Sequence, residues 1–393
     1  MQIANSNNKI GAKILLVSAT GGWGGAEQVI YNIGRYLISE GWRVVSACPG
    51  DGILAERLDA AGAKVRPYNP VLLNLAHGYR SLPRQLASLR RANREIYRIL
   101  EAEQVDIIHG NTIQGHWNAF LAARRARLPI VFHAHDILPD SLPHRLWTLC
   151  SLYYCNTIIA VSNAVARYLK KCKIPPAKMR VIYPLHDVET LIHSFKGEPE
   201  FKAKQDDDRP VVGFIGALIP RKAPRDLILA AKKLISKGFQ VLFIFVGDSI
   251  SADEEYALMT QNLPEKIGIG SYIQFVGFQL DPFSWVKRFD IFVMPSREDP
   301  CPLAVFEAMY FRKPVIGTNV GGIPEQISDG ETGFIVPKND PEALAEKLQI
   351  LIDTPSLRKK MGEAGQRRVT TQFDPKEIFT SILNLYNSLL AND

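Results

Sequence analysis

The chain has 393 residues, of which 46% are hydrophobic and 22% are charged, and its formal net charge is +7. This composition is close to the average for folded proteins, so it excludes disordered, collagen-like and coiled-coil chains, and the length favours two domains. The five cysteines contain no CxxC pair, which argues against a disulfide framework or a zinc site and indicates a reducing compartment.

The first half of the chain alternates short apolar runs with helical stretches, which predicts a parallel sheet covered by helices on both faces. The N-terminal segment is polar, and the apolar run Ile14–Val17 is too short for a signal segment or a membrane span, so we expect a cytoplasmic protein. Strands are predicted at Lys13–Ser18, Arg43–Ala47, Lys64–Pro67, Ile107–His109, Ile130–His133 and Thr157–Val161. Helices are predicted at Ala26–Glu40, Ile53–Ala61 and Leu82–Glu101.

Residues 187–209 then combine turn formers and charges without apolar periodicity, which predicts a linker. Beyond it the same alternation restarts, with strands at Val211–Gly216, Gln240–Val246, Ile273–Val276, Ile291–Met294 and Pro314–Gly317 and helices that include Ala223–Lys237 and Pro302–Phe311. We therefore expect an α/β protein with an N-terminal domain at residues 1–190, a linker at 191–209 and a second domain at 210–372.

The C-terminal residues 373–393 contain an amphipathic helix at Pro375–Leu390, which needs a partner surface on its own domain or on the N-terminal one. Basic residues gather in Arg80–Arg98, Arg124–Arg127 and Lys170–Lys173. They suit an anionic lipid surface or a phosphorylated substrate, although a solvated helix face explains them as well. No aromatic-interleaved pattern or finger spacing indicates nucleic acid as a partner.

Four glycines, Gly21, Gly22, Gly24 and Gly25, precede Glu27 at the turn from the first strand into the first helix. Glycines at such a turn let backbone N–H groups approach a phosphate at the start of a helix. The spacing differs from the GxGxxG of dinucleotide sites, so a tight strand-to-helix turn is an equal interpretation.

Polar side chains also follow two other strands of the first half, at His109 and Asn111 and at His133, His135 and Asp136. Ligands of doubly wound sheets bind at these carboxyl ends, and we favour His135 as the functional histidine. A zinc site on the HxH pair lacks a third ligand in the sequence, and one of the histidines is expected to be structural.

Two loops of the second half carry charges that suit a nucleotide donor. Arg221 and Lys222 follow the first strand of that half, where they can neutralise a diphosphate or simply form a surface charge pair. Glu298 and Asp299 follow a later strand, and Glu307 lies on the helix behind them. The free N–H groups at the start of that helix suit a phosphate. Glu307 either accepts hydrogen bonds from ribose hydroxyls or is a carboxylate that caps the helix or interacts with the helix dipole.

Taken together, these motifs resemble family 4 of the retaining glycosyltransferases (glycosyl transferases group 1), and the resemblance covers nearly the whole chain. It implies the GT-B fold, in which two Rossmann-like, doubly wound parallel-sheet domains face a central cleft. The motifs are GGAE (Gly24–Glu27), HD (His135, Asp136), the loop Lys222, VGD (Val246–Asp248), VGF (Val276–Phe278), the acidic loop and helix, GGIPE (Gly321–Glu325) and GETGFIV (Gly330–Val336).

The resemblance also implies roles for individual residues. Glu307 would bind the ribose, Lys222 would neutralise the diphosphate, and His135 would contact the donor sugar near the reacting centre. The expected catalytic residues are His135, Asp299, Glu298 and Lys222. The expected donor-binding residues are Gly24, Gly25, Arg221, Lys222, Gly277, Phe278, Cys301, Pro302, Leu303, Ala304 and Glu307. The expected acceptor-binding residues are Glu27, His109, Asn111 and Asp136.

Three positions depart from the family pattern. The usual Glu-x7-Glu pair has Asp299 in place of its first glutamate, so Glu298 is an alternative contact for the sugar hydroxyls. The arginine that often follows the loop glycine is Ala217 here, which leaves Arg221 as a substitute. The usual Asn-Gly after the inter-domain strand is replaced by Tyr183–Asp187.

The sequence therefore predicts transfer of a hexose-type sugar, with retention, from a UDP- or GDP-sugar to a glycan, lipid-linked or small-molecule acceptor in polysaccharide or glycolipid synthesis. The resemblance implies that neither a metal ion nor another cofactor is needed. Peripheral contact with the anionic inner face of a membrane is a further expectation. The rival interpretations are a sugar-nucleotide epimerase on the same scaffold and a non-catalytic protein that binds sugar nucleotides.

Overall fold

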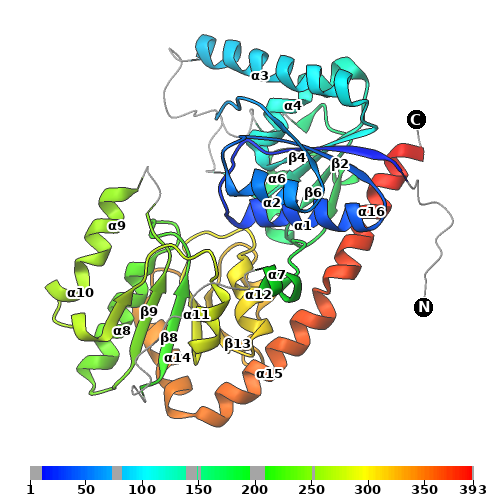
Figure 1. Ribbon diagram of the computed structural model, residues 1–393. Helices are drawn as coiled ribbons and strands as arrows, with labels where there is room; N and C mark the ends of the chain where they lie inside the picture. Colours follow the sequence, from blue (N-terminus) through cyan, green and yellow to red (C-terminus); the bar gives the residue numbers. More distant parts are fainter. Residues whose placement is uncertain are drawn as a thin grey trace. The chain divides into compact units, whose positions relative to one another are not determined.

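The computed structural model describes residues 11–72, 82–138, 148, 152–194, 209–249 and 253–391. It divides into two compact units, and the predicted fold of two Rossmann-like α/β domains is confirmed (Figure 1). Unit 1 comprises residues 1–186 and 375–393, and unit 2 comprises residues 187–374. Most of the predicted linker, residues 195–208, lies outside the described residues.

Unit 1 contains a seven-stranded sheet in the order β3-β2-β1-β4-β5-β6-β7, and every neighbouring pair is parallel. The central strands are continuous apolar runs because helices cover both of their faces. The strands are β1 (Lys13–Val17), β2 (Arg43–Cys48), β3 (Lys64–Pro67), β4 (Ile107–Asn111), β5 (Ile130–Ala134), β6 (Thr157–Ala160) and β7 (Met179–Val181). The helices are α1 (Gly25–Ser39), α2 (Ile53–Ala60), α3 (Leu82–Glu103), α4 (Thr112–Ala126), α6 (Asn163–Lys171), the 3₁₀ turn η3 (Pro176–Lys178) and α16 (Pro375–Ala391).

The C-terminal helix α16 belongs to unit 1 and lies along α1 (Figure 1). Its apolar stripe is buried there, with the ring of Phe379 5.0 Å from that of Tyr36 and the ring of Tyr386 5.9 Å from that of Trp42. The amphipathic pattern of α16 is therefore explained by a surface that lies almost the whole chain away in sequence.

Unit 2 contains a six-stranded parallel sheet in the order β10-β9-β8-β11-β12-β13, with a core rich in phenylalanine and branched aliphatic side chains. The strands are β8 (Val211–Ile215), β9 (Leu242–Val246), β10 (Ile273–Phe275), β11 (Ile291–Met294), β12 (Val315–Thr318) and β13 (Gly333–Val336). The helices are α7 (Val188–Ser194), α8 (Pro224–Ser236), α9 (Glu254–Gln261), α10 (Leu263–Lys266), η4 (Gly270–Tyr272), α11 (Phe283–Arg288), α12 (Leu303–Tyr310), α13 (Ile323–Gln326), α14 (Pro341–Asp353) and α15 (Pro355–Gln372).

The strand order reverses direction once in each sheet, between β1 and β4 in unit 1 and between β8 and β11 in unit 2. At such a point the loops after neighbouring strands leave in opposite directions, and the carboxyl ends of the strands open a crevice for a ligand. The fold therefore provides two candidate ligand sites, one at the reversal point of each sheet.

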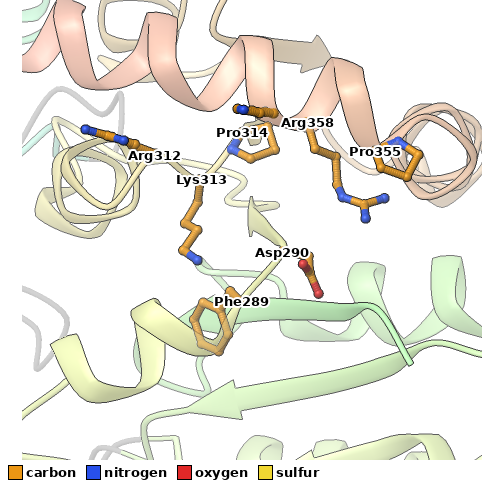
Figure 2. A pocket seen from close by; sticks show the side chains of 8 residues that line it. Phe289, Asp290, Arg312, Lys313, Pro314, Pro355 and Arg358 are labelled. Atoms are coloured by element: carbon orange, nitrogen blue, oxygen red, sulfur yellow. The ribbon is translucent and has the colours of Figure 1, made fainter. Parts of the chain in front are cut away.

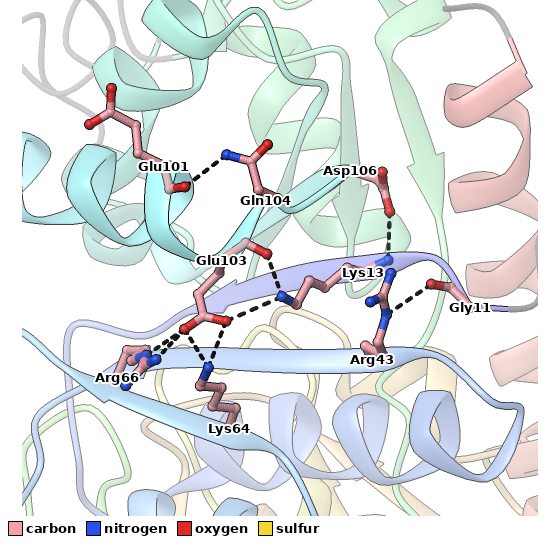
Figure 3. Close-up of polar contacts among 9 residues, drawn as sticks. All are labelled: Gly11, Lys13, Arg43, Lys64, Arg66, Glu101, Glu103, Gln104 and Asp106. Atoms are coloured by element: carbon pink, nitrogen blue, oxygen red, sulfur yellow. Dashed lines mark hydrogen bonds and ion pairs between the residues drawn. The ribbon is translucent and has the colours of Figure 1, made fainter.

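A buried carboxylate ties α3 to the sheet of unit 1 (Figure 3). Glu103, at the end of α3, is 2% exposed and forms ion pairs with Lys13 of β1 and with Lys64 and Arg66 of β3. Burial alone would raise the pKa of Glu103, but the hydrogen bonds from Lys64, Arg66 and Lys13 outweigh it and lower the pKa to about 2. The carboxylate is therefore ionised wherever the protein is folded at ordinary pH.

Candidate functional site

An ion pair joins the two strands that flank the reversal point of unit 2. Lys222 follows β8 and Asp299 follows β11, and the Lys222 Nζ lies 2.6 Å from the Asp299 Oδ2. The side chain of Asp299 is 5% exposed and that of Lys222 is 16% exposed. Ser296 Oγ donates a second hydrogen bond to the same Asp299 oxygen at 3.0 Å. Two residues expected in the catalytic set are thus brought together at the carboxyl edge of the sheet.

The loop that carries Asp299 is held by the chain after β12. Gly321 has a φ of +53°, and a Cβ there would lie 1.8 Å from the Asp299 carbonyl oxygen. Gly322 N donates to that oxygen at 3.0 Å, and Thr318 Oγ1 donates to Ser296 O at 2.5 Å. Sequence reasoning assigned no role to Ser296, Thr318 or the Gly321 turn, although the two glycines of GGIPE were a signal for a close backbone approach.

The other two charged candidates lie beside this pair. Arg221 is exposed, and its Nη1 donates to the Glu298 carbonyl oxygen at 3.3 Å, while Arg297 N donates to Arg221 O at 2.8 Å. Arg297 is in turn paired with Asp226 of α8 at 3.0 Å. The loops after β8 and β11 therefore form one connected surface with three cations.

Helix α12 begins directly behind the acidic loop. Pro302 is its N-cap residue and makes no side-chain cap, and Gln326 Nε2 donates to Pro302 O at 3.0 Å. The first backbone N–H groups of a helix, here those of Leu303 and Ala304, have no partner within the helix and can donate to an anion. Glu307 lies one turn further and is 3% exposed.

Cys301 precedes α12, and its thiol is held in the protonated form. Burial raises the pKa of its thiol well above the ordinary value, and the charges of Asp299 and Glu325 raise it further. Its predicted contribution to donor binding therefore rests on its backbone and on the packing of the neutral side chain.

Gly277 and Phe278 follow β10 at the same edge of the sheet. Gly277 has a φ of +72°, and its carbonyl oxygen accepts a hydrogen bond from Gly247 N at 2.8 Å. The turn leaves Phe278 54% exposed. An exposed aromatic ring at the carboxyl end of a strand offers a flat apolar surface on which a nucleobase can stack.

In unit 1 the glycine turn after β1 is closed by its own glutamate. Glu27 is 8% exposed, and its carboxylate accepts a hydrogen bond from Gly24 N at 3.1 Å and another from Thr20 Oγ1. Asn111, at the end of β4, donates to Ala26 O at 3.0 Å across the reversal point. The side chains of Glu27 and Asn111 therefore form hydrogen bonds with the turn itself. Their contact with an acceptor stays a prediction.

The histidines that follow β4 and β5 occupy three different depths. His109 and His133 have no exposed surface, His135 is half-buried and Asp136 is exposed. The buried position of His109 argues against the acceptor contact expected from the sequence, whereas Asp136 remains accessible. Within the described ranges, no group of three His, Cys, Asp or Glu side chains is arranged to hold a metal ion.

Burial keeps the imidazoles neutral. It lowers the pKa of His135 to about 3, and it does the same for His109 with a further contribution from the nearby His135. The pKa of His133 is lowered well below its ordinary value for the same reasons. The ring of His133 lies 4.1 Å from that of His135, and His135 Nε2 has no hydrogen-bond partner in the part of the chain that the structure describes. His135 is therefore neutral and half-buried, and its Nε2 lies beneath the surface.

A separate cavity of about 250 Å³ lies near the amino ends of β11 and β12 (Figure 2). Its basic side chains serve the fold: Lys313 Nζ donates to Lys287 O at 2.8 Å, and Arg358 Nη1 donates to Leu351 O at 2.7 Å. The charged ends of Arg312, Lys313 and Arg358 point in different directions and do not converge on one anion. We therefore do not assign a ligand to this cavity.

Comparison with known proteins gives a consistent result. The family model described as "Glycosyl transferases group 1" matches residues 196–368, and the one described as "Glycosyltransferase Family 4" matches residues 23–190. The chain is 33% identical over 188 residues to a capsular polysaccharide biosynthesis glycosyltransferase, CapM, of Staphylococcus aureus, and this match spans 47% of each chain. It is 24% identical over 372 residues to a D-inositol 3-phosphate glycosyltransferase of Kribbella flavida, covering 88% of this chain and 86% of that one.

Two solved structures share the fold. A glycosyltransferase from Rickettsia africae superposes with a TM-score of 0.81 at 23% identity, covering 98% of this chain and 100% of that one. Anabaena HepE, solved in complex with UDP and glucose, superposes with a TM-score of 0.80 at 21% identity, covering 96% of this chain and 100% of that one.

Proposed function

The chain belongs to the glycosyl transferases group 1 family, and we propose that it transfers a hexose-type sugar, with retention, from a nucleotide diphosphate donor to a glycan, lipid-linked or small-molecule acceptor. The observation that carries this proposal is the Lys222–Asp299 pair at the reversal point of unit 2, directly in front of the uncapped start of α12. A cation and helix N–H groups at one sheet edge are suited to a diphosphate. HepE was solved with UDP and glucose, which makes UDP-sugars the first donors to test, followed by GDP-sugars.

We assign the parts of the donor to residues of unit 2. The Lys222 ammonium and the N–H groups of Leu303 and Ala304 bind the diphosphate. The carboxylate of Glu307 accepts hydrogen bonds from the ribose hydroxyls, and the nucleobase stacks near Phe278. Asp299 orients the sugar hydroxyls: both hydrogen bonds to its side chain engage Oδ2, and among the described residues no donor occupies Oδ1. We also propose that His135 contacts the sugar near its reacting carbon, as the family resemblance implies.

The reaction breaks the bond between the anomeric carbon and the phosphate oxygen and forms a bond from the acceptor oxygen on the same face. The acceptor proton passes to the departing phosphate, and the nucleoside diphosphate leaves. Negative charge grows on that phosphate in the transition state, so Lys222 and the start of α12 stabilise it where it develops. Positive charge is thus supplied by the chain itself, and we expect turnover without an added metal ion.

The proposal is tested with a panel of UDP-, GDP- and ADP-sugars, read out as release of nucleoside diphosphate with and without candidate acceptors. We expect acceptor-dependent release from one donor. Lys222→Ala should lower kcat/KM about 10²–10³-fold, because it removes a charge that acts on the leaving group. Lys233→Ala is the matched control, since Lys233 also pairs with a carboxylate, Glu342, but on the surface of α8 and α14. Equal activity of the Lys222 and Lys233 variants would refute the assigned site.

We further propose that the acceptor side docks on an anionic membrane through α3, and that the protein works in the cytoplasm. The exposed side of α3 carries Arg84, Arg90, Arg91, Arg94 and Arg98. Among the residues that the structure describes, no helix is both long and apolar enough to cross a bilayer. A basic surface helix attracts anionic lipid through its charges.

A further inference from the structure

Three buried side chains of unit 1 form a polar chain that begins on the C-terminal helix, and the half-buried His135 lies at its end. Tyr386 of α16 places its Oη 2.7 Å from His109 Nδ1 on β4. His109 Nε2 lies 3.3 Å from His133 Nδ1 on β5. The ring of His133 lies against that of His135, with their centroids 4.1 Å apart. Tyr386, His109 and His133 have no exposed surface, so water does not compete for these contacts.

The direction of hydrogen bonding along this chain follows from Tyr386. Burial raises the pKa of its phenol far above the ordinary value, so the hydroxyl keeps its proton. Within the described part of the chain, His109 is the only polar partner of that hydroxyl. Either direction leaves one buried proton without a partner, on the phenol or on His133 Nε2. A phenol O–H is a stronger donor than an imidazole N–H, and an imidazole nitrogen is a stronger acceptor than a phenol oxygen. Tyr386 therefore donates to His109 Nδ1.

This direction fixes where each neutral imidazole carries its single proton. His109 accepts at Nδ1, so its proton is on Nε2, and it donates to His133 Nδ1. His133 in turn carries its proton on Nε2. That nitrogen is buried beside His135 and has no partner among the described residues. The ring orientation of His133 is consequently held from one side only, by the chain that starts at Tyr386.

We propose that Tyr386 is a positioning residue for the reaction: through His109 it sets the tautomer and orientation of His133, and His133 supports the ring of His135. The effect on turnover rests on the proposed function, in which His135 contacts the donor sugar. The effect on the tautomers does not. A helix at the end of the chain thereby gains a role beyond covering apolar surface.

The tautomers are tested directly by ¹⁵N NMR of histidine-labelled protein without substrate. In the wild type we expect His109 and His133 each to carry the proton on Nε2; a proton on Nδ1 of either ring overturns the inference without any variant. In Tyr386→Phe the direction is no longer set, and we expect both tautomers of His133. An unchanged His133 tautomer in this variant also overturns the inference.

Turnover gives the second readout. Tyr386→Phe should lower kcat for sugar transfer about five- to tenfold while the KM for the donor changes less than about twofold, because a supporting group is lost rather than a donor contact. Tyr36→Phe is the control. It also removes a phenolic oxygen, at the contact between α1 and Phe379 of α16, but Tyr36 is not part of the polar chain. An equal kcat for both variants overturns the positioning role. If the NMR spectra show the expected tautomers but the protein transfers no sugar, the tautomer assignment stands and the proposed function is refuted.

Discussion

At the scale of single residues, the pair of Lys222 and Asp299 implies competition between a carboxylate and a diphosphate for one ammonium group. The two charged atoms are 2.6 Å apart and the carboxylate is nearly buried, so a diphosphate at Lys222 must share the cation with Asp299. The same carboxylate is the proposed contact for the sugar hydroxyls. Binding of the nucleotide and turnover of the sugar should therefore respond to Asp299 in opposite ways.

Asp299→Asn should bind the free nucleoside diphosphate about two- to fivefold more tightly, because Lys222 is released from its counter-charge. The same variant should lose at least about tenfold in kcat, because the amide is a weaker acceptor for sugar hydroxyls than the carboxylate. Calorimetry and steady-state kinetics give the two numbers. Glu298→Gln should cost less in kcat; a larger loss for that variant would make Glu298 the sugar contact instead.

The sequence placed the candidate residues at the ends of strands but left the direction of their side chains undetermined. His109, Asn111 and His135 all follow strands, yet the first two are buried in the sheet and only the third is half-exposed. Position in the chain reveals the end of a strand, whereas the side chain's depth depends on neighbours far away in sequence, such as Tyr386. Ser296 was missed because a buried serine carries no pattern of its own.

At the scale of elements, the turn after β12 sets the position of the acidic loop. Gly321→Ala should displace the Asp299 backbone, since its Cβ would lie 1.8 Å from the carbonyl oxygen. We expect a stability loss of about 1–3 kcal/mol and weaker binding of nucleoside diphosphate. Gly330→Ala is a matched control, because Gly330 has a φ of +76° with no atom within 4 Å of its Cβ position. Thermal unfolding and calorimetry compare them, and equal nucleotide binding by both would contradict the role of the turn.

Helix α3 carries the proposed membrane contact. Arg91→Ser combined with Arg94→Ser should lower the partition onto anionic vesicles about 10- to 30-fold, at about 1 kcal/mol per arginine. Flotation with phosphatidylserine vesicles and with neutral vesicles measures it. A double serine variant of the exposed Lys237 and Lys266 of unit 2 controls for net charge. If both double variants and the wild type float alike, α3 is only a solvated helix face.

Long apolar strands were predictable from sequence, but α4 was not. Its buried side includes His116 and Asn118 beside Trp117 and Phe120, so the side chains that face the core do not read as an apolar stripe. Asn118 is buried because its amide bonds with Val71, on a segment 47 residues earlier. The packing of α4 depends partly on hydrogen bonds of buried polar side chains, whereas hydrophobic periodicity detects only the apolar positions of a helix.

At the scale of the whole molecule, the stability of unit 1 depends on the ionised Glu103. Its folded pKa of about 2 lies below the ordinary value of 4.5, so this stabilisation is present above about pH 4.5 and is lost as the pH falls toward 2. Glu103→Gln should cost about 2 kcal/mol at pH 7, an amount reduced by the partial exposure of Lys64 and Arg66. The difference from wild type should shrink as the pH falls below 4.

Glu101→Gln is the control for that prediction, because Glu101 lies on the same turn of α3 but is exposed (Figure 3). Urea unfolding between pH 3 and pH 7 measures both variants. A cost for Glu103→Gln that stays constant over this range would show that its three ion pairs do not stabilise the fold.

The domain organisation was largely visible in the sequence, because the alternation of strands and helices restarts in the second half. The place of α16 was not, because an amphipathic stripe specifies that a partner exists and not which one. Its partners, such as Tyr36 and Trp42, come from the first strands and helices of the chain. Long-range pairing of this kind is set by the folded surface as a whole.

The central claim, sugar transfer with retention, is tested most directly by following the reaction of an isotope-labelled donor with its acceptor by NMR. The account predicts that nucleoside diphosphate and a glycosylated acceptor appear together, and that the transferred sugar keeps the anomeric configuration it had in the donor. An inverted product, or a donor whose sugar is isomerised in the absence of acceptor, would contradict it.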